Sequence, residues 1–128
     1  MNEDDLYERG LAVRRDVLGA ENFTSNLAKA DDFMMTFQHA VTELAWGYAW
    51  SRPGLDRRTR PILTLGTLAG LGRYPELGIY TKGAIGNGVT VEEIKEILVH
   101  VSAYCGTPAG RQSFLAAHEA LKEAGALP

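Results

Sequence analysis

The chain has 128 residues, of which 45% are hydrophobic and 23% charged, a balance that predicts a single domain over residues 1–128. Its formal net charge of −3 argues against nucleic-acid binding, which needs a basic face. No apolar run approaches the roughly 18 residues of a membrane span, and the acidic first residues do not resemble a signal peptide. The single cysteine, Cys105, cannot form an internal disulfide, so we expect a cytoplasmic protein.

The apolar spacings and the chain breakers predict about six helices and no sheet, an all-α fold. The first helix is expected over residues 4–18, and a loop around 22–25 should follow it. The second helix is expected over residues 31–50, with an aspartate as its N-cap. Phe33 and Phe37 belong to the apolar stripe that this helix should bury.

The third helix is expected over residues 56–71 and carries leucines on most of its sides, including Leu63 and Leu71. A helix that is apolar all round is buried, so we expect it at the centre of the fold. Gly66 and Gly70 lie one turn apart, and small residues at that spacing let a second helix approach closely.

Three further helices are predicted by their end signals. Pro75 suits the first turn of the fourth helix, and Asn87-Gly88 ends it. Thr90 and Glu93 form a capping box at the start of the fifth helix, which should reach Cys105. The last helix is expected over residues 108–124.

Four arginines lie within nine residues of an otherwise acidic chain: Arg52, Arg57, Arg58 and Arg60. One interpretation is a solvated basic corner that pairs with the chain's own carboxylates. The other is an anion site, because guanidinium groups bind carboxylates through paired hydrogen bonds and free amides are available at a helix start.

His39, Glu43 and Trp46 follow one another at spacings of four and three, which places them on one stripe of the second helix. His39 and Glu43 could be hydrogen-bonded, or both could face a pocket. The simpler interpretation is an amphipathic helix with a polar edge and an aromatic anchor. A carboxylate beside an apolar ring could instead act as an acid.

The other reactive side chains favour structural roles. His100 is expected to be hydrogen-bonded near Glu96 and Tyr104, and His118 to be solvated. Cys105 is expected to be a buried thiol at a helix end, where the dipole disfavours a thiolate. The three histidines are not spaced as metal ligands, and no phosphate-binding or dinucleotide motif is present.

Several segments together resemble the γ-carboxymuconolactone decarboxylase family, and the similarity runs from about residue 7 to 121. The most specific part is the stretch WSRPGLDRR. The segments are Thr42–Gly47, Trp50–Arg60, Leu71–Arg73, Asn87–Thr90 and Tyr104–Ala109.

This resemblance implies an all-α fold like that of alkylhydroperoxidase D, assembled as a homo-oligomer such as a hexamer or trimer. It also implies cofactor-free decarboxylation of a small carboxylated lactone in aromatic (protocatechuate) catabolism, with no metal. The peroxidase relatives use a CxxC pair, which a chain with one cysteine cannot supply.

The chain departs from the family at one position, because Tyr80 stands where the family has a histidine on the fourth helix. A phenol can donate to an oxyanion, but its ordinary pKa near 10 makes it a poorer proton shuttle. Arg111 is a second departure, where a neutral residue is expected. Both changes favour an altered substrate or a lost activity.

The candidate site therefore combines residues from three predicted helices and from the turn at residues 51–54. We expect Glu43 to be the acid or base, Tyr80 the oxyanion donor, and Arg58 with Arg52 the carboxylate clamp. Arg57, Trp46 and His39 are expected to line the substrate site, with Trp46 as the apolar wall.

Three hypotheses follow for the function. The first is a decarboxylase of a small carboxylated lactone, and the second is a different lyase or isomerase on the same scaffold. The third is an oligomeric binding protein that has lost its chemistry.

Overall fold

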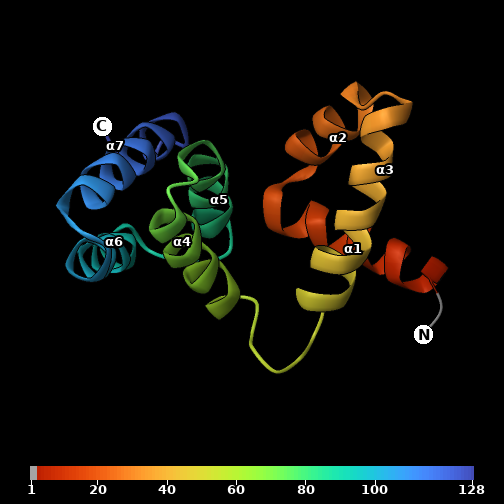
Figure 1. Ribbon diagram of the computed structural model, residues 1–128, viewed down its shortest axis with the longest axis horizontal. Helices are drawn as coiled ribbons and strands as arrows, with labels where there is room; N and C mark the ends of the chain where they lie inside the picture. Colours follow the sequence, from red (N-terminus) through yellow and green to blue (C-terminus); the bar gives the residue numbers. More distant parts are fainter. Residues whose placement is uncertain (1–2) are drawn as a thin grey trace. The chain divides into compact units, whose positions relative to one another are not determined.

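The computed structural model describes residues 3–128, which form seven α-helices and one π-helical segment and contain no β-strand (Figure 1). These residues form two compact units, one that ends at Asp56 and one that spans Arg57–Pro128. The predicted all-α class is therefore confirmed, whereas a single domain over residues 1–128 stays a prediction. Within the described residues, no helix is both long enough and apolar enough to cross a membrane.

The first unit is held together by a close crossing between its first and last helical segments. Its elements, drawn from red to yellow in Figure 1, are α1 (Glu3–Leu18), α2 (Ala20–Lys29), α3 (Asp32–Val41) and η1 (Thr42–Ala49). A Cβ atom on Gly10 of α1 would lie 2.1 Å from the Thr42 carbonyl oxygen, and one on Gly47 would lie 2.2 Å from that of Leu6. Glycine is required at both positions, because any side chain would push α1 and η1 apart.

The segment predicted as one helix over residues 31–50 changes its hydrogen bonding halfway along. Asp31 caps it as predicted, because its side chain accepts a hydrogen bond of 2.9 Å from the Met34 amide. After Val41, however, the chain continues as the π-helix η1, and the Trp50 amide bonds to the Ala45 carbonyl at 2.8 Å. Turns of this width are found mostly as single π-bulges, often at functional sites.

Two further expectations for this unit are wrong. The loop expected around residues 22–25 is part of α2, which buries Phe23 against the guanidinium of Arg15 at 4.8 Å. The stripe expected to bury Phe33 and Phe37 is not covered, since these rings are 82% and 57% exposed. Periodicity identifies an apolar face, but it does not say that anything packs on it.

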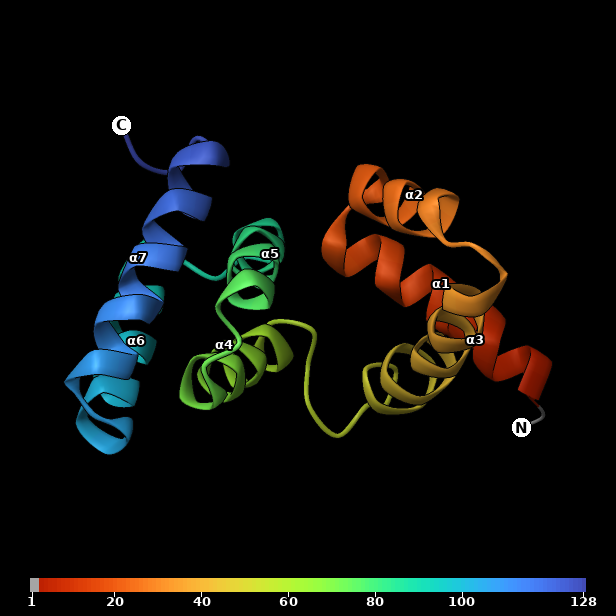
Figure 2. The same cartoon turned by 45° about the horizontal axis from the view of Figure 1, so that its top comes forward.

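The second unit packs four α-helices around an apolar core, with α6 and α7 side by side (Figure 2). Helix α7 also contacts α5, and α4 contacts both α5 and α6. The core residues include Leu65, Leu77, Ile94 and Leu98, all at 2% exposure or less. The elements are α4 (Thr59–Leu71), α5 (Tyr74–Gly86), α6 (Val91–Cys105) and α7 (Thr107–Glu123).

The end signals of this unit are confirmed, but the predicted central helix is not buried all round. Thr90 and Glu93 form the capping box at the start of α6, through bonds of 3.1 and 3.0 Å between side chains and amides. Helix α4 begins at Thr59 rather than near 56, and Leu63 and Leu71 are 57% and 66% exposed. Of its two glycines, only Gly70 approaches another helix, near the Cys105 sulfur.

Candidate active site

A cavity of about 390 Å³ lies in the first unit, where α1 meets η1 and the turn that follows it. Arg52, one of the predicted clamps, lines this cavity, and its guanidinium carbon lies 5.1 Å above the centre of the Tyr48 ring. The Ser51 hydroxyl lines it too and donates to the Gly47 carbonyl oxygen. A cavity of this size is in the range of small-molecule sites.

Arg9 of α1 lines the same cavity, so two arginines border one space. Sequence reasoning missed Arg9, because it lies on a helix far from the arginine-rich segment and no local pattern links the two. The remaining lining residues are uncharged: Leu6, Gly47, Tyr48, Ser51 and Pro53. The arrangement therefore suits an anion with more than one carboxylate.

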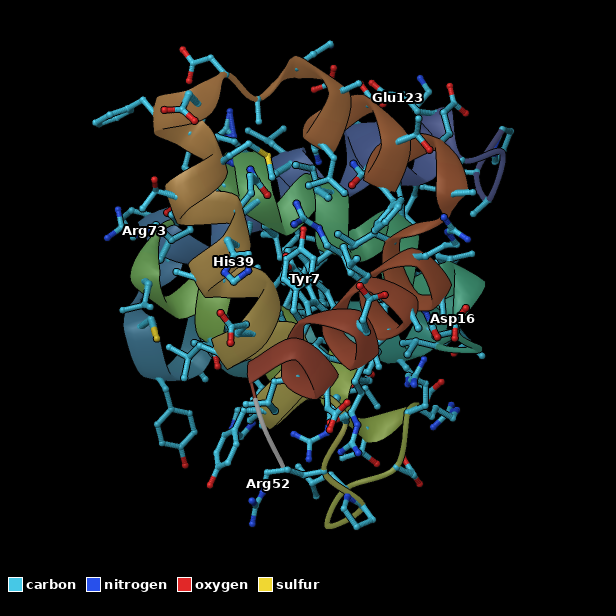
Figure 3. The ribbon with its side chains drawn as sticks, turned by 90° about the vertical axis from the view of Figure 1, so that its right-hand side faces the viewer. Tyr7, Asp16, His39, Arg52, Arg73 and Glu123 are labelled. Atoms are coloured by element: carbon cyan, nitrogen blue, oxygen red, sulfur yellow. The ribbon has the colours of Figure 1, made fainter. Side chains whose placement is uncertain are left out.

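The predicted pairing of His39 with Glu43 is present. The ring nitrogen Nδ1 of His39 lies 2.8 Å from the Glu43 carboxylate, on adjacent turns of α3 and η1. The Tyr7 ring of α1 stacks on the imidazole, with centroids 4.3 Å apart and an interplanar angle of 14° (Figure 3). Since a carboxylate only accepts, Nδ1 carries the proton and Nε2 is left for other partners.

This histidine and the arginine cavity are separate places on the first unit. Figure 3 shows Tyr7 and His39 next to each other and Arg52 well apart from both. The histidine side chain is 52% exposed and that of Glu43 is 21% exposed. The two predicted groups Glu43 and Arg52 thus share a unit but not a cavity.

Buried side chains hold together the helices that carry the His39–Glu43 pair and the arginine cavity. Arg14 of α1 is 6% exposed and donates to Gln38 at 2.7 Å and to the Thr42 hydroxyl at 3.4 Å. Trp46 is only 2% exposed and lies against Trp50, with ring centres 5.0 Å apart. Trp46 is therefore part of the interior of the first unit.

Arg58, the second predicted clamp, makes an ion pair inside the second unit. Its guanidinium binds the Glu93 carboxylate and also donates to the Gly88 carbonyl oxygen at 3.3 Å. The hydrogen bond from this guanidinium is the main reason why the pKa of Glu93 lies below its ordinary value of 4.5. The hydrogen bond from the Thr90 amide lowers the pKa further. Arg58 thus joins the head of α4 to the start of α6, which competes with binding a substrate.

The other predicted site residues of the second unit lie at different depths. Arg57 is exposed in the turn before α4. Tyr80 is half-buried on α5 and packs against the apolar core of its unit. The predicted set is therefore divided, with Glu43, His39, Trp46 and Arg52 in the first unit and the remaining residues in the second.

A second hollow, of about 590 Å³, lies between α4 and α6 and is mostly apolar. His100 lines it, with its ring centre 4.8 Å from that of Tyr104, while its hydrogen bonding stays a prediction. Cys105 also lines it and is exposed, so the expectation of a buried thiol is wrong. Among residues 3–128, no group of three or more acidic, histidine or cysteine side chains is arranged to hold a metal ion.

Comparison with known proteins identifies the class of the fold. The model of the carboxymuconolactone decarboxylase family matches residues 36–119, which include parts of both units. The chain belongs to this family, as the resemblance of its motifs predicts.

Two relatives are decarboxylases named for different substrates. The chain is 41% identical to the 4-carboxymuconolactone decarboxylase of Acinetobacter baylyi over 128 residues, all of this chain and 96% of that protein. It is 43% identical to nitrosuccinic acid decarboxylase npaB of Metarhizium robertsii over 118 residues, 92% of this chain and 82% of that protein. An uncharacterized 15.0 kDa protein of Paracoccus denitrificans is 35% identical over 71 residues, about half of each chain. The predicted class of enzyme, a decarboxylase, is thereby confirmed.

Proposed function

We propose that this enzyme removes CO2 from a small dicarboxylic lactone, γ-carboxymuconolactone, without a cofactor. The observation that supports this substrate most is the 41% identity with a 4-carboxymuconolactone decarboxylase along the entire chain. The cavity with Arg52 and Arg9 adds a place for an anionic substrate.

The chemistry needs no cofactor, because the substrate accepts its own electrons. The scissile carboxylate is attached to a saturated ring carbon, next to a double bond that is itself conjugated with the lactone carbonyl. When the bond to CO2 breaks, its electron pair moves to the carbonyl oxygen and forms a dienolate. A proton then adds to carbon. The protein has to bind two carboxylates, stabilise one oxyanion and supply one proton.

We assign carboxylate binding to Arg52, because it alone of the two predicted clamps lines the 390 Å³ cavity. Arg58 remains a proposed but weaker carboxylate-binding residue, because its guanidinium is paired with Glu93. Glu43, bound to His39, is the proposed acid or base, and Tyr80 the proposed oxyanion donor. Arg57, His39 and Trp46 stay proposed substrate-site residues.

Purified enzyme and γ-carboxymuconolactone test the substrate directly, by the ultraviolet absorbance of the enol-lactone product. Turnover at rates typical of enzymes, at least about 1 per second, is expected. A folded protein that leaves the lactone unchanged would refute this substrate. Arg52→Ala should raise KM, whereas Glu43→Gln and Tyr80→Phe should lower kcat if they act on the reacting atoms.

The 43% identity with a nitrosuccinic acid decarboxylase favours a second candidate substrate. Nitrosuccinic acid is also a dicarboxylate, and its nitro group can accept the electron pair that CO2 leaves behind. The replacement of the family histidine by Tyr80 agrees with a changed electron acceptor. Offering both compounds in equal concentration and measuring each product by NMR decides between them.

We also propose that the enzyme is a homo-oligomer, a hexamer or a trimer, in the cytoplasm. Large apolar side chains are exposed on both units, among them Phe33 at 82%, Leu63 at 57% and Tyr104 at 81%. Exposed apolar surface of this kind is usually covered by a partner. Light scattering on a size-exclusion column measures the mass, and a single species of 14.0 kDa would refute the oligomer.

A further inference from the structure

We propose that Arg9 is a second carboxylate-binding residue, which together with Arg52 makes the cavity of the first unit selective for dicarboxylates over monocarboxylates. This proposal rests on the proposed function and adds to it the residue that reads the second carboxylate.

The first support is the composition of the cavity wall. The guanidinium groups of Arg9 and Arg52 come from α1 and from the turn after η1, and none of the residues that line the cavity is acidic. Guanidinium groups bind carboxylates through charge-assisted, paired hydrogen bonds. A ligand with two carboxylates can give each guanidinium its own partner.

The second support is that other arginines of this unit are committed to the protein itself, whereas Arg9 is not. Arg14 is buried on Gln38 and Thr42, and Arg15 lies over the Phe23 ring. Within the described part of the chain, the Arg9 side chain makes no ion pair or hydrogen bond. Its guanidinium is therefore available to a ligand without loss of an internal contact.

The third support is that the wall behind the arginines is rigid. Gly47 lines the cavity at the point where η1 touches the Leu6 carbonyl of α1, so the two walls cannot slide freely. The Tyr48 ring lies beneath the Arg52 guanidinium and limits its orientations. A pre-organised wall lowers the ordering cost of binding, so only the Arg9 side chain has to be positioned when a ligand binds.

Two other hollows lack this charge pattern. The hollow between α5 and α7 contains Lys82, but Lys82 is paired with Glu123, which lines the same hollow. The groove between α4 and α6 contains Glu96 and is otherwise mainly apolar. Neither hollow is lined by two arginines.

The test uses succinate and butyrate as probes, which have the same number of carbons but two carboxylates and one. Isothermal titration of the full-length protein should show that succinate binds more tightly than butyrate. Arg9→Ala should weaken succinate about 10- to 100-fold and leave butyrate nearly unchanged. Arg15→Ala, on the same helix but outside the cavity, is the matched control and should keep the preference. Arg9→Lys should restore part of it, because a lysine keeps the charge without the paired donors.

The kinetics give a second readout. Arg9→Ala should raise KM for a dicarboxylate substrate and change kcat little, which a loss of folding would not do. A wild-type protein without preference for succinate, or an Arg9→Ala variant that keeps it, overturns the inference. Preference for succinate without any decarboxylation would instead refute the proposed function and leave the site standing.

Discussion

Replacing Gly10 by alanine tests the crossing on which the cavity depends. The new Cβ atom would lie 2.1 Å from the Thr42 carbonyl oxygen and 2.9 Å from the Gly47 amide nitrogen. Both contacts are with backbone atoms, which cannot rotate away. Helices α1 and η1 must separate by at least about 0.9 Å to bring the shorter contact to 3.0 Å.

The energy change has two opposing parts. Overpacking of a closed interface costs about 1–3 kcal/mol, and a backbone clash belongs at the upper end of that range. Alanine has a higher helix propensity than glycine, which stabilises the helix by about 1 kcal/mol. The net destabilisation is about 2 kcal/mol, which corresponds to a melting temperature lower by about 8 °C for a chain of this length.

Thermal unfolding followed by circular dichroism measures this difference. Gly78→Ala is the matched control, because a Cβ atom on this mid-helix glycine would lie at an ordinary 3.9 Å from its nearest neighbours. The control should be unchanged or stabilised by up to about 1 kcal/mol. A Gly10→Ala variant as stable as the wild type would refute the close crossing. Because α1 carries Arg9, we also expect KM for a dicarboxylate to rise in this variant.

Three further predictions concern the second unit. Glu93→Gln should destabilise the protein at pH 7. The difference in stability from the wild type should disappear as the pH falls through the lowered pKa of Glu93, below 4.5. A difference in stability that is unchanged at pH 3 would contradict the ion pair with Arg58. Thr90→Ala should cost about 1 kcal/mol in a denaturant titration through loss of the cap, whereas Thr67→Ala in the exposed interior of α4 should change stability by less than about 0.5 kcal/mol. Tyr80→His should raise turnover of γ-carboxymuconolactone if the tyrosine marks a changed substrate, and equal turnover in both proteins would show that this position does not choose it.

Local sequence signals anticipated much of the helical structure. The caps at Asp31 and Thr90 and the stop at Asn87-Gly88 are where the sequence predicts them. Each of these signals acts between atoms only a few residues apart, so it does not depend on the rest of the fold. The pairing of His39 with Glu43 is local in the same sense, because one helical turn separates them.

Burial was harder to anticipate than helicity. The apolar stripe with Phe33 and the leucines of α4 were expected in a core, yet much of this surface is exposed. The π-helical turn after Val41 also has no distinct sequence signal, since the residues around it suit an ordinary α-helix.

By itself, the sequence determined the helical class, most helix ends and the family, because these follow from short-range hydrogen bonds and contiguous motifs. Only the tertiary structure brought Arg9 to the cavity of Arg52 and joined Arg58 to Glu93, 35 positions further along the chain. Such long-range contacts depend on how the helices pack, and the packing depends on close approaches such as the one at Gly10. No local pattern encodes them, because the atoms that decide them belong to different helices.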